Sequence, residues 1–315
     1  MKNPITNAKI LPNFNPLHYT KRSIKRGDKA FVMSRSQLHE FSKCPSKWIR
    51  GGGSEDESTT STNWGTLIDC LLTQPDKFAD MFSVRPNKYP SDDGEKPWNG
   101  NSKWCRKWIA DQGGLIVISE ETLREANWAV QRLKQDPNTS ALLDGAKVQV
   151  FVAGEYHDRD TGLVIPVCGL IDVAPKADAL VDIKTARYAD LARWGRVVNE
   201  HWYDAQGAIY CDLWEAATGE KREEFWHVIQ ENSSPYEIAH ASLSVEFLSM
   251  GRAKYRNALR LYAHCLATGD WLTYNGIATG LNIGGRNVVG PESWMQDAKT
   301  TGPIEDPDWM TEKAA

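Results

Sequence analysis

From residue 146 onward, the apolar residues of the chain recur at every second position. Three such stretches follow one another, KVQVFVAGEYHD (147–158), LVIPVCGLIDVAP (163–175) and ALVDIKTA (179–186). Alternation with period two is typical of a strand, and the connecting segments DRDTG and PKAD have the composition of turns. The pattern predicts three successive antiparallel strands, and EEFWHVIQ (223–230) and PYEIAHASL (235–243) predict two more.

On both sides of these strands the apolar spacing is that of a helix. Helices are predicted within 34–48, 63–78, 102–111, 120–136, 189–198, 201–217 and 244–267. Ser34 followed by Gln37 is a capping-box pattern, Pro75 stops the second helix, and Gly219 follows the end of the sixth. This order of elements predicts an α/β fold with a central mixed β-sheet flanked by helices.

The patterned part of the chain spans residues 33–275, and we expect it to form one domain. Residues 1–32 are polar and basic and are predicted to form an arm, whereas residues 276–315 are weakly patterned and are predicted to form an irregular tail. Within the domain, 51–63 and 83–102 are predicted loops, and long ordered loops in compact domains often have a function.

Composition narrows the function classes only partly. The 315 residues carry a net charge of −4, which does not favour nucleic-acid binding, although an enzyme can confine positive charge to one groove. The six cysteines include no CxxC pair, which argues against a zinc ribbon and a disulfide framework. No apolar run resembles a signal peptide or a membrane span, so we expect a soluble cytoplasmic protein that binds no membrane.

Two acidic residues stand where the strand pattern predicts buried side chains. Period two places Asp182 and Lys184 on one face of a strand, with Ile183 toward the core. If the APKAD turn pairs this strand with the preceding one, Asp172 lies beside Asp182, and such carboxylates need a proton or a cation between them. A hard divalent cation with oxygen ligands is the natural occupant, and Mg²⁺ typically binds through one or two carboxylates. The alternative, a solvent-facing ion pair beside a turn residue, stays open on this pattern alone.

Three further polar residues lie in apolar helical stretches. Gln206 and Tyr210 stand one turn apart in WYDAQGAIYCDLW, on or beside an apolar stripe where a buried amide needs a partner. Asp69 lies in WGTLIDCLL, one turn after Gly65. Taken singly, Asp69 is an ordinary exposed residue and Gln206 with Tyr210 a core hydrogen bond. Taken with the strand residues, they form an ordered set: helix carboxylate, strand Asp, strand Asp-x-Lys, helix Gln-x3-Tyr.

This order and spacing resemble the PD-(D/E)XK nuclease superfamily, in particular the RecE-type (exodeoxyribonuclease VIII-like) and phage RecB-like exonucleases. The matching passages are MSRSQLHEFSKCPSKW, WGTLIDCLLTQPDKF, KPWNGNSKWCRKW, GLIDVAPKADALVDIKTA and DAQGAIYCDLW. They cover residues 33–275 and imply a restriction-endonuclease-like core.

The resemblance implies a metal-dependent nuclease. Asp172 and Asp182, joined by the main-chain carbonyl of Ile183, would bind Mg²⁺ or Mn²⁺, and Lys184 would be the catalytic lysine. Asp69 falls where RecE-type members usually carry His and other relatives carry Glu, so it is a further candidate ligand.

Two other features are interpreted through the same resemblance. Gln206 and Tyr210 would form the downstream motif that supports the site and contacts DNA. Cys44 precedes Pro45 as in iron–sulfur relatives, but no cysteine cluster lies near the C-terminus, so no iron–sulfur cluster is predicted.

Basic and aromatic side chains could hold the substrate. The candidates for the DNA backbone are Arg35, Lys43, Lys47, Arg50, Lys103, Arg106 and Lys107, and Trp98 and Trp104 could stack on an unpaired end base. For each of them a solvated charge or ordinary packing is the alternative.

The leading hypothesis is a DNA exonuclease that resects duplex ends 5′→3′ in phage-type recombination. The resemblance implies a homo-oligomer and a single-strand annealing recombinase as partner. Two alternatives are a Cas4-like or endonucleolytic member of the superfamily, and a non-catalytic DNA-binding protein that retains the fold.

Overall fold

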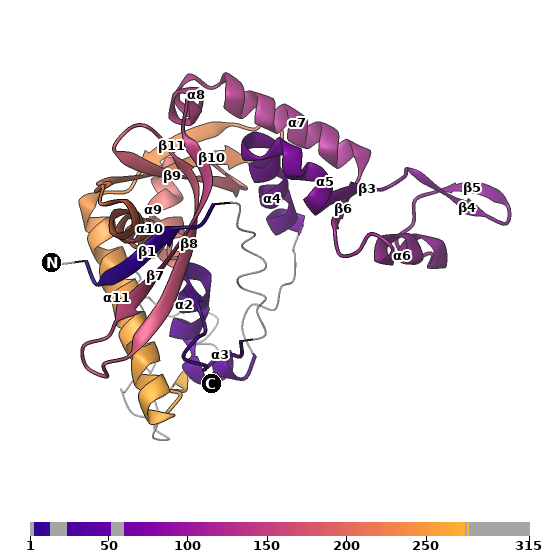
Figure 1. The fold of residues 1–315 in the computed structure, drawn as a ribbon. Coiled ribbons are helices and arrows are strands. Elements are labelled where there is room, and N and C mark those ends of the chain that lie inside the picture. The colour runs from indigo at the N-terminus through magenta and orange to yellow at the C-terminus, as the bar shows by residue number, and fades with distance from the viewer. Residues whose placement is uncertain (1–2, 13–23, 52–59, 275, 277–315) are drawn as a thin grey trace, which may run out of the picture. The chain divides into compact units, whose positions relative to one another are not determined.

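The computed structural model describes residues 3–12, 24–51, 60–274 and 276 (Figure 1). The chain divides into two compact units, Met1–Trp271 and Leu272–Ala315. All the elements described below belong to the first unit. Among the described helices, none is long and apolar enough to cross a membrane. The predicted irregular tail lies almost wholly outside the described residues.

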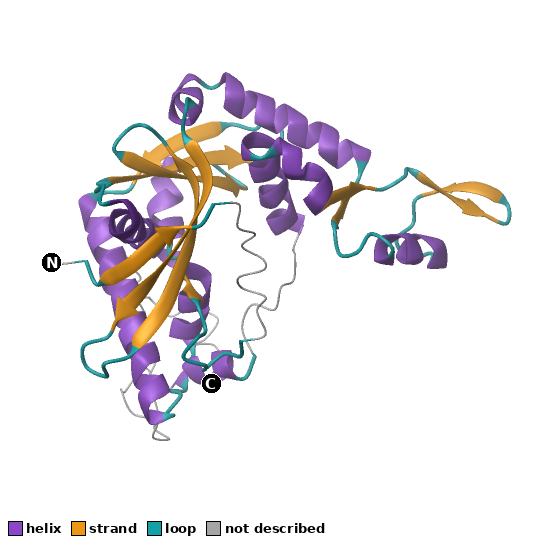
Figure 2. Ribbon diagram, in the orientation of Figure 1, coloured by secondary structure: helices purple, strands orange, loops and turns teal. Residues whose placement is uncertain are grey.

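A mixed seven-stranded sheet forms the centre of this unit (Figure 2). Its strands are β1 (Ile5–Ile10), β2 (Met33–Ser34), β7 (Lys147–His157), β8 (Val164–Ala174), β9 (Ala179–Ala186), β10 (Glu224–Glu231) and β11 (Ile238–Ser242). The order is β1-β7-β8-β9-β10-β11, with β2 paired to β8. Only β9–β10 and β2–β8 are parallel. The prediction of a central mixed sheet is confirmed.

Helices cover both faces of the sheet (Figure 1). One face packs against α2 (Arg35–Lys43), α3 (Pro45–Ile49), α9 (Leu191–Glu200), α10 (Tyr203–Thr218) and α11 (Val245–Thr268). The other packs against α4 (Thr60–Thr73) and α7 (Glu120–Gln135), which is followed by α8 (Pro137–Leu143). Strand alternation divides β9 between the two cores: Leu180 belongs to the first, and Val181 and Ile183 belong to the second.

The helix ends follow the predicted signals. The side chain of Ser34 accepts a hydrogen bond from the backbone N–H of Gln37 at 3.3 Å and caps α2. Helix α4 ends before Pro75, where a short 3₁₀ turn, η1 (Pro75–Lys77), leads into α5 (Phe78–Met81). Gly219 ends α10 with φ of 77°, a left-handed conformation that favours glycine.

The segment predicted as a long loop, 83–102, contains a β-hairpin instead. Its strands are β4 (Lys88–Ser91) and β5 (Gly94–Pro97), and α6 (Lys103–Ala110) follows. Two short strands, β3 (Phe82–Val84) and β6 (Ile116–Ile118), pair in parallel and close the segment. Aromatic rings pack within it: Trp98 lies 5.5 Å from Trp108 and 6.4 Å from Trp104 between ring centroids.

The N-terminal segment is also more ordered than predicted. Residues 5–10 were expected in a basic arm outside the domain, but they form β1, which pairs antiparallel with β7 at the edge of the sheet. Residues 13–23 of the predicted arm, which include Lys21 and Arg22, lie outside the described residues.

Helices α10 and α11 are joined by buried ion pairs. Asp212 of α10 binds Arg252 at 3.0 Å and Arg256 at 3.2 Å, and Asp204, two turns earlier, binds Lys254 at 2.6 Å. Both carboxylates are buried, so each needs its partner to offset the loss of hydration. These contacts fix α10 against α11 at two points along its length.

Candidate active site

The sheet opens into a fork between β8 and β9. The ladder between these strands consists of one residue pair, Val173 with Val181. One step further in that register Asp172 lies opposite Asp182, and there the backbone N–H of Ile183 donates to Asp172 Oδ2 at 2.9 Å. The strand and turn pattern of the sequence therefore correctly placed the two acids side by side.

Asp182, Lys184 and Gln206 form one hydrogen-bonded group. Gln206 Nε2 donates to Asp182 Oδ1 at 2.6 Å, and its Oε1 accepts from Lys184 Nζ at 3.2 Å. Lys184 also forms a close ion pair with Asp182 Oδ2. Since the amide uses both its donor and its acceptor, α10 holds the two charged groups of β9 in a fixed relation.

Lys184 is held as a protonated amine. Its Nζ lies 4.4 Å from the centroid of the Tyr203 ring, a cation–π contact. Burial lowers the pKa of Lys184, but the Asp182 carboxylate and Tyr203 outweigh burial, so the pKa lies above its ordinary value. The group is therefore a permanent positive charge at neutral pH.

Tyr210 lies one turn after Gln206 and packs directly on β8. A side chain at Gly169 would place its Cβ 2.6 Å from Tyr210 Cε1, so the ring can occupy this position only over a glycine. Burial, followed by the charge of Asp182, raises the pKa of Tyr210 to about 12. Tyr210 is buried, with its ring packed against the backbone of β8 at Gly169.

Asp69 approaches the fork from the opposite layer. It lies on α4, whose Gly65 faces β9 so closely that an added Cβ would lie 3.2 Å from Thr185 Oγ1. Burial and the charge of Asp182 raise the pKa of Asp69 to about 7. Burial, Asp182 and Asp69 together raise the pKa of Asp172 well above its ordinary range. Three acids thus share one lysine, which could balance only one of them if all three were ionised.

This donor set fits a hard divalent cation in its chemistry. All the side-chain donors are carboxylate oxygens, and Asp172 and Asp182 alone supply the one or two carboxylates that Mg²⁺ typically uses. The set is not a closed cage: across the described ranges, no three His, Cys, Asp or Glu side chains are grouped so as to hold a metal ion. A cation here would complete its shell with water or phosphate oxygens.

The sequence pattern did not predict several residues of the site. Tyr203 and Trp194 come from the helices after β9, and His227 is the register partner of Asp182 on β10. Trp194 Nε1 donates to His227 Nδ1 at 3.1 Å, and burial lowers the pKa of His227 to about 4, so the imidazole is neutral. Its only sequence signal was a lone histidine between apolar residues in EEFWHVIQ.

Comparison with known proteins agrees with this arrangement. Residues 34–280 match a family model described as "PDDEXK-like domain of unknown function (DUF3799)". The chain belongs to this family. The PD-(D/E)XK resemblance is thereby confirmed. A search of the curated proteins finds no match.

A solved structure with a similar fold bears on this PDDEXK-like domain. A crystal structure described as a "Putative exonuclease" from Eubacterium rectale superposes with a TM-score of 0.53 at 18% identity, over 91% of this chain and 98% of that one. The structure of SSO0001 (TM-score 0.28, 16% identity, 51% of this chain and 68% of that one) and that of Scheffersomyces stipitis Rai1 with (3'-NADP)+ and calcium ion (0.25, 12%, 83% and 73%) are too dissimilar to carry an argument. At 18% identity, the first of these structures shows a shared fold.

Only one of the predicted DNA contacts of this PDDEXK-like domain reaches the fork. Arg35 donates to His201 O at 3.2 Å and to Gln206 Oε1 at 3.5 Å, and its guanidinium lies over the Tyr203 ring. The other basic candidates, Lys43, Lys47, Arg50, Lys103, Arg106 and Lys107, are exposed on α2, α3 and α6 or, for Arg50, at the end of α3. Lys43 pairs with Glu40 at 2.8 Å.

The two tryptophans predicted to stack on DNA are largely occupied by protein contacts. Trp98 is half-buried against Trp104 and Trp108, with the Arg85 guanidinium 5.2 Å from its ring centroid. Trp104 is more exposed, but it also stacks on Tyr89. Ordinary packing, the alternative interpretation, describes Trp98 best.

Proposed function

We propose that this protein is a metal-dependent nuclease that hydrolyses phosphodiester bonds of DNA at duplex ends. The observation that carries the proposal is the fork itself, where Asp172 and Asp182 lie side by side with the protonated Lys184 bound to Asp182. Membership in a PDDEXK-like family and the likeness to the Eubacterium rectale structure support it.

The protonation state of Lys184 assigns its role in the reaction. Because its pKa is raised, the amine at neutral pH has no lone pair with which to accept a proton from water. We infer that Lys184 instead stabilises the negative charge that develops on the phosphoryl oxygens. The Gln206 side chain keeps the Nζ of Lys184 in place through the 3.2 Å hydrogen bond.

The carboxylates provide the place for the cation. Asp172 and Asp182 would hold Mg²⁺ or Mn²⁺, with Asp69 and the main-chain carbonyl of Ile183 as further ligands. When bound, the cation supplies Lewis-acid polarisation of the phosphoryl oxygen and lowers the pKa of a water molecule. Without it, the raised pKa values of Asp69 and Asp172 mean that these acids retain protons closer to neutral pH.

Substrate polarity and partners rest on the family resemblance alone. We propose 5′→3′ resection in phage-type recombination, a homo-oligomeric enzyme and a single-strand annealing recombinase as partner. The exposed cations of α6, Lys103, Arg106 and Lys107, support a contact with duplex phosphates, since within the described residues none of them forms an ion pair.

The test uses linear and closed circular duplex DNA with Mg²⁺ or Mn²⁺. We expect the wild type to degrade only the linear DNA, and Asp182→Asn and Lys184→Gln each to slow it about 10²–10³-fold. The first removes a carboxylate proposed to hold the cation, and the second removes the positive charge proposed to stabilise the phosphoryl oxygens. Lys176→Gln and Asp178→Asn, which change the same residue types in the exposed β8–β9 turn, are matched controls that should retain activity.

Each other outcome selects a rival function. Cleavage of the circular DNA indicates an endonuclease of the same superfamily. Absence of cleavage of either DNA with both cations would leave a non-catalytic DNA-binding protein.

A further inference from the structure

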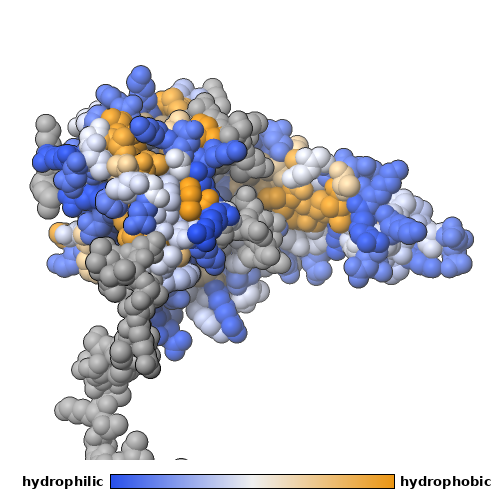
Figure 3. Space-filling view, turned by 90° about the horizontal axis from the view of Figure 1, so that it is seen from below, coloured by the Kyte–Doolittle hydropathy of each residue, from blue (hydrophilic) through white to orange (hydrophobic). Residues whose placement is uncertain are grey.

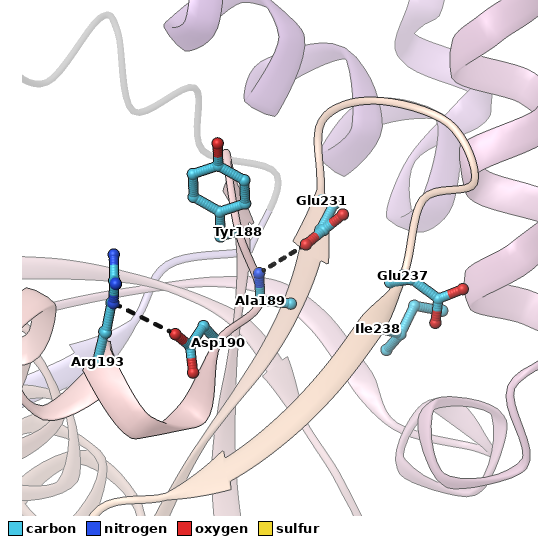
Figure 4. A pocket seen from close by; sticks show the side chains of 7 residues that line it. All are labelled: Tyr188, Ala189, Asp190, Arg193, Glu231, Glu237 and Ile238. Atoms are coloured by element: carbon cyan, nitrogen blue, oxygen red, sulfur yellow. Dashed lines mark hydrogen bonds and ion pairs between the residues drawn. The ribbon is translucent and has the colours of Figure 1, made fainter.

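A cleft of about 570 Å³ opens where the parallel strands β9 and β10 end (Figure 4). β9 carries Asp182 and Lys184 and ends at Ala186, after which the chain passes through Arg187 and Tyr188 into the wall of the cleft. Four residues of extended chain span about 13 Å. The cleft therefore begins within about 13 Å of the catalytic lysine proposed above.

Tyr188 presents an aromatic ring to this cleft. The residue is 58% exposed, and in Figure 4 its ring stands away from the loop that carries it. The guanidinium of Arg187 lies 5.2 Å from the ring centroid, so a cation accompanies the aromatic surface. Ile238, on β11, adds an apolar contact surface on the opposite wall.

Hydrogen bonds and ion pairs hold the loop of Tyr188 in place. Glu231, at the end of β10, accepts the backbone N–H of Ala189 at 3.1 Å. Asp190 caps α9 and pairs with Arg193 at 3.5 Å, and Glu237 pairs with an arginine of α7 at 3.8 Å. The backbone next to Tyr188 is thus tied to the sheet.

The chemistry of the cleft suits a base better than a phosphate. Arg193, a cation of the cleft lining, is already paired with Asp190, and Glu231 and Glu237 offer no attraction for a phosphate. Carboxylate oxygens do accept hydrogen bonds from the amino groups of bases. Every base has a π-face, and stacking on an exposed aromatic ring is the common mode by which proteins bind an unpaired strand.

We propose that this cleft binds an unpaired nucleobase of the strand that enters or leaves the active site, stacked on Tyr188. The inference rests on the proposed function, since it takes the substrate to be DNA. It assigns Tyr188 as a substrate-binding residue that affects affinity and leaves the chemical step unchanged.

The test compares Tyr188→Ala with Tyr188→Phe, which keeps the ring. Trp128→Ala is a matched control, because Trp128 on α7 is also 58% exposed and has the Arg124 guanidinium over its ring. Binding of a fluorescein-labelled DNA hairpin with an unpaired overhang is measured by anisotropy in EDTA, and cleavage of the same hairpin is measured with Mg²⁺.

We expect Tyr188→Ala to weaken binding by about fivefold to 150-fold, the range for loss of one stacked base. KM should rise with little change in kcat, and the salt dependence of binding should stay the same, since no phosphate contact is lost. Tyr188→Phe and Trp128→Ala should bind within about twofold of the wild type.

The assignment of Tyr188 would be overturned if Tyr188→Ala bound DNA as tightly as the wild type, or if the Ala and Phe variants lost affinity equally. Cleavage of DNA by the wild type would still leave the proposed function intact. Failure of the wild type itself to cleave DNA overturns the proposed function, and is seen without any variant.

Discussion

Replacement of Asp69 by Asn tests the electrostatics of the fork directly. Asp69 has its pKa raised from an ordinary 3.8 to about 7, by burial and by Asp182. This raised pKa corresponds to about 4 kcal/mol of unfavourable free energy for the ionised carboxylate in the folded, cation-free protein. The folded state binds more protons than the unfolded state between pH 4 and 7, so this acid contributes stability at low pH that is lost as pH rises through 7.

Asp69→Asn should therefore stabilise the cation-free protein at pH 8. At about 2–4 °C per kcal/mol for a domain of this size, we expect Tm to rise by about 8–16 °C. The advantage should shrink by about 2–3 kcal/mol at pH 5, where Asp69 of the wild type is protonated.

Thermal unfolding followed by circular dichroism in EDTA, from pH 5 to pH 8, measures both quantities. Asp80→Asn, which changes an exposed carboxylate on α5, is the control and should change Tm little at any pH. With added Mg²⁺ or Mn²⁺ the wild type should gain more stability than Asp69→Asn if Asp69 is a ligand. A lower Tm for Asp69→Asn at pH 8 in EDTA, or a difference that does not vary with pH, would refute the account of three acids sharing one lysine.

Two further sets of substitutions test the packing of the fork and the electrostatic contact with DNA. Gly169→Ala should lower the free energy of unfolding by about 1–3 kcal/mol and reduce kcat, because the added methyl group would lie 2.6 Å from the Tyr210 ring. Urea unfolding measures the loss of stability, and single-turnover cleavage measures the loss of rate. Wild-type values in both assays would show that the ring moves freely. Changing Lys103, Arg106 and Lys107 together to Gln should reduce the slope of log Kd against log salt concentration by about 2–3, since each phosphate contact contributes about 0.9 to that slope. An unchanged slope would exclude α6 from the DNA contact.

The fold was predictable where burial enforces a period. Strands β7, β8 and β9 carry apolar side chains that pack between two helix layers, Gly219 ends α10, and Ser244 and Gly269 cap α11. Strand β1 was missed because it is a short edge strand, interrupted by Asn7 with φ of 50° and by a register shift between Thr6 and Lys9. The β4–β5 hairpin was missed because its residues are largely exposed and polar, so no buried face imposes a period.

The site was predictable to the extent that it is encoded by short spacing. Asp182-x-Lys184 and Gln206-x3-Tyr210 each follow from the period of one element, and Asp172 follows from a turn. Tyr203 lies on α10 like Gln206, whereas Arg35 and His227 come from two other elements, α2 and β10. Only the tertiary fold brings the three side chains to the group of Asp182, Lys184 and Gln206. The local spacing of residues in the sequence cannot predict such long-range contacts.

The ion pairs between α10 and α11 bear on how the sequence can diverge. Asp204 and Asp212 lie on the side of α10 opposite Gln206 and Tyr210, because two residues along a helix turn the side chain by about 200°. The position of the Gln206 amide, which holds Lys184, therefore depends on arginine and lysine side chains of α11 that bind the opposite side of α10. Substitutions at Asp212, Arg252 and Arg256 should accordingly be tolerated only in concert, and homologous chains in which one has changed should show compensation at the other two.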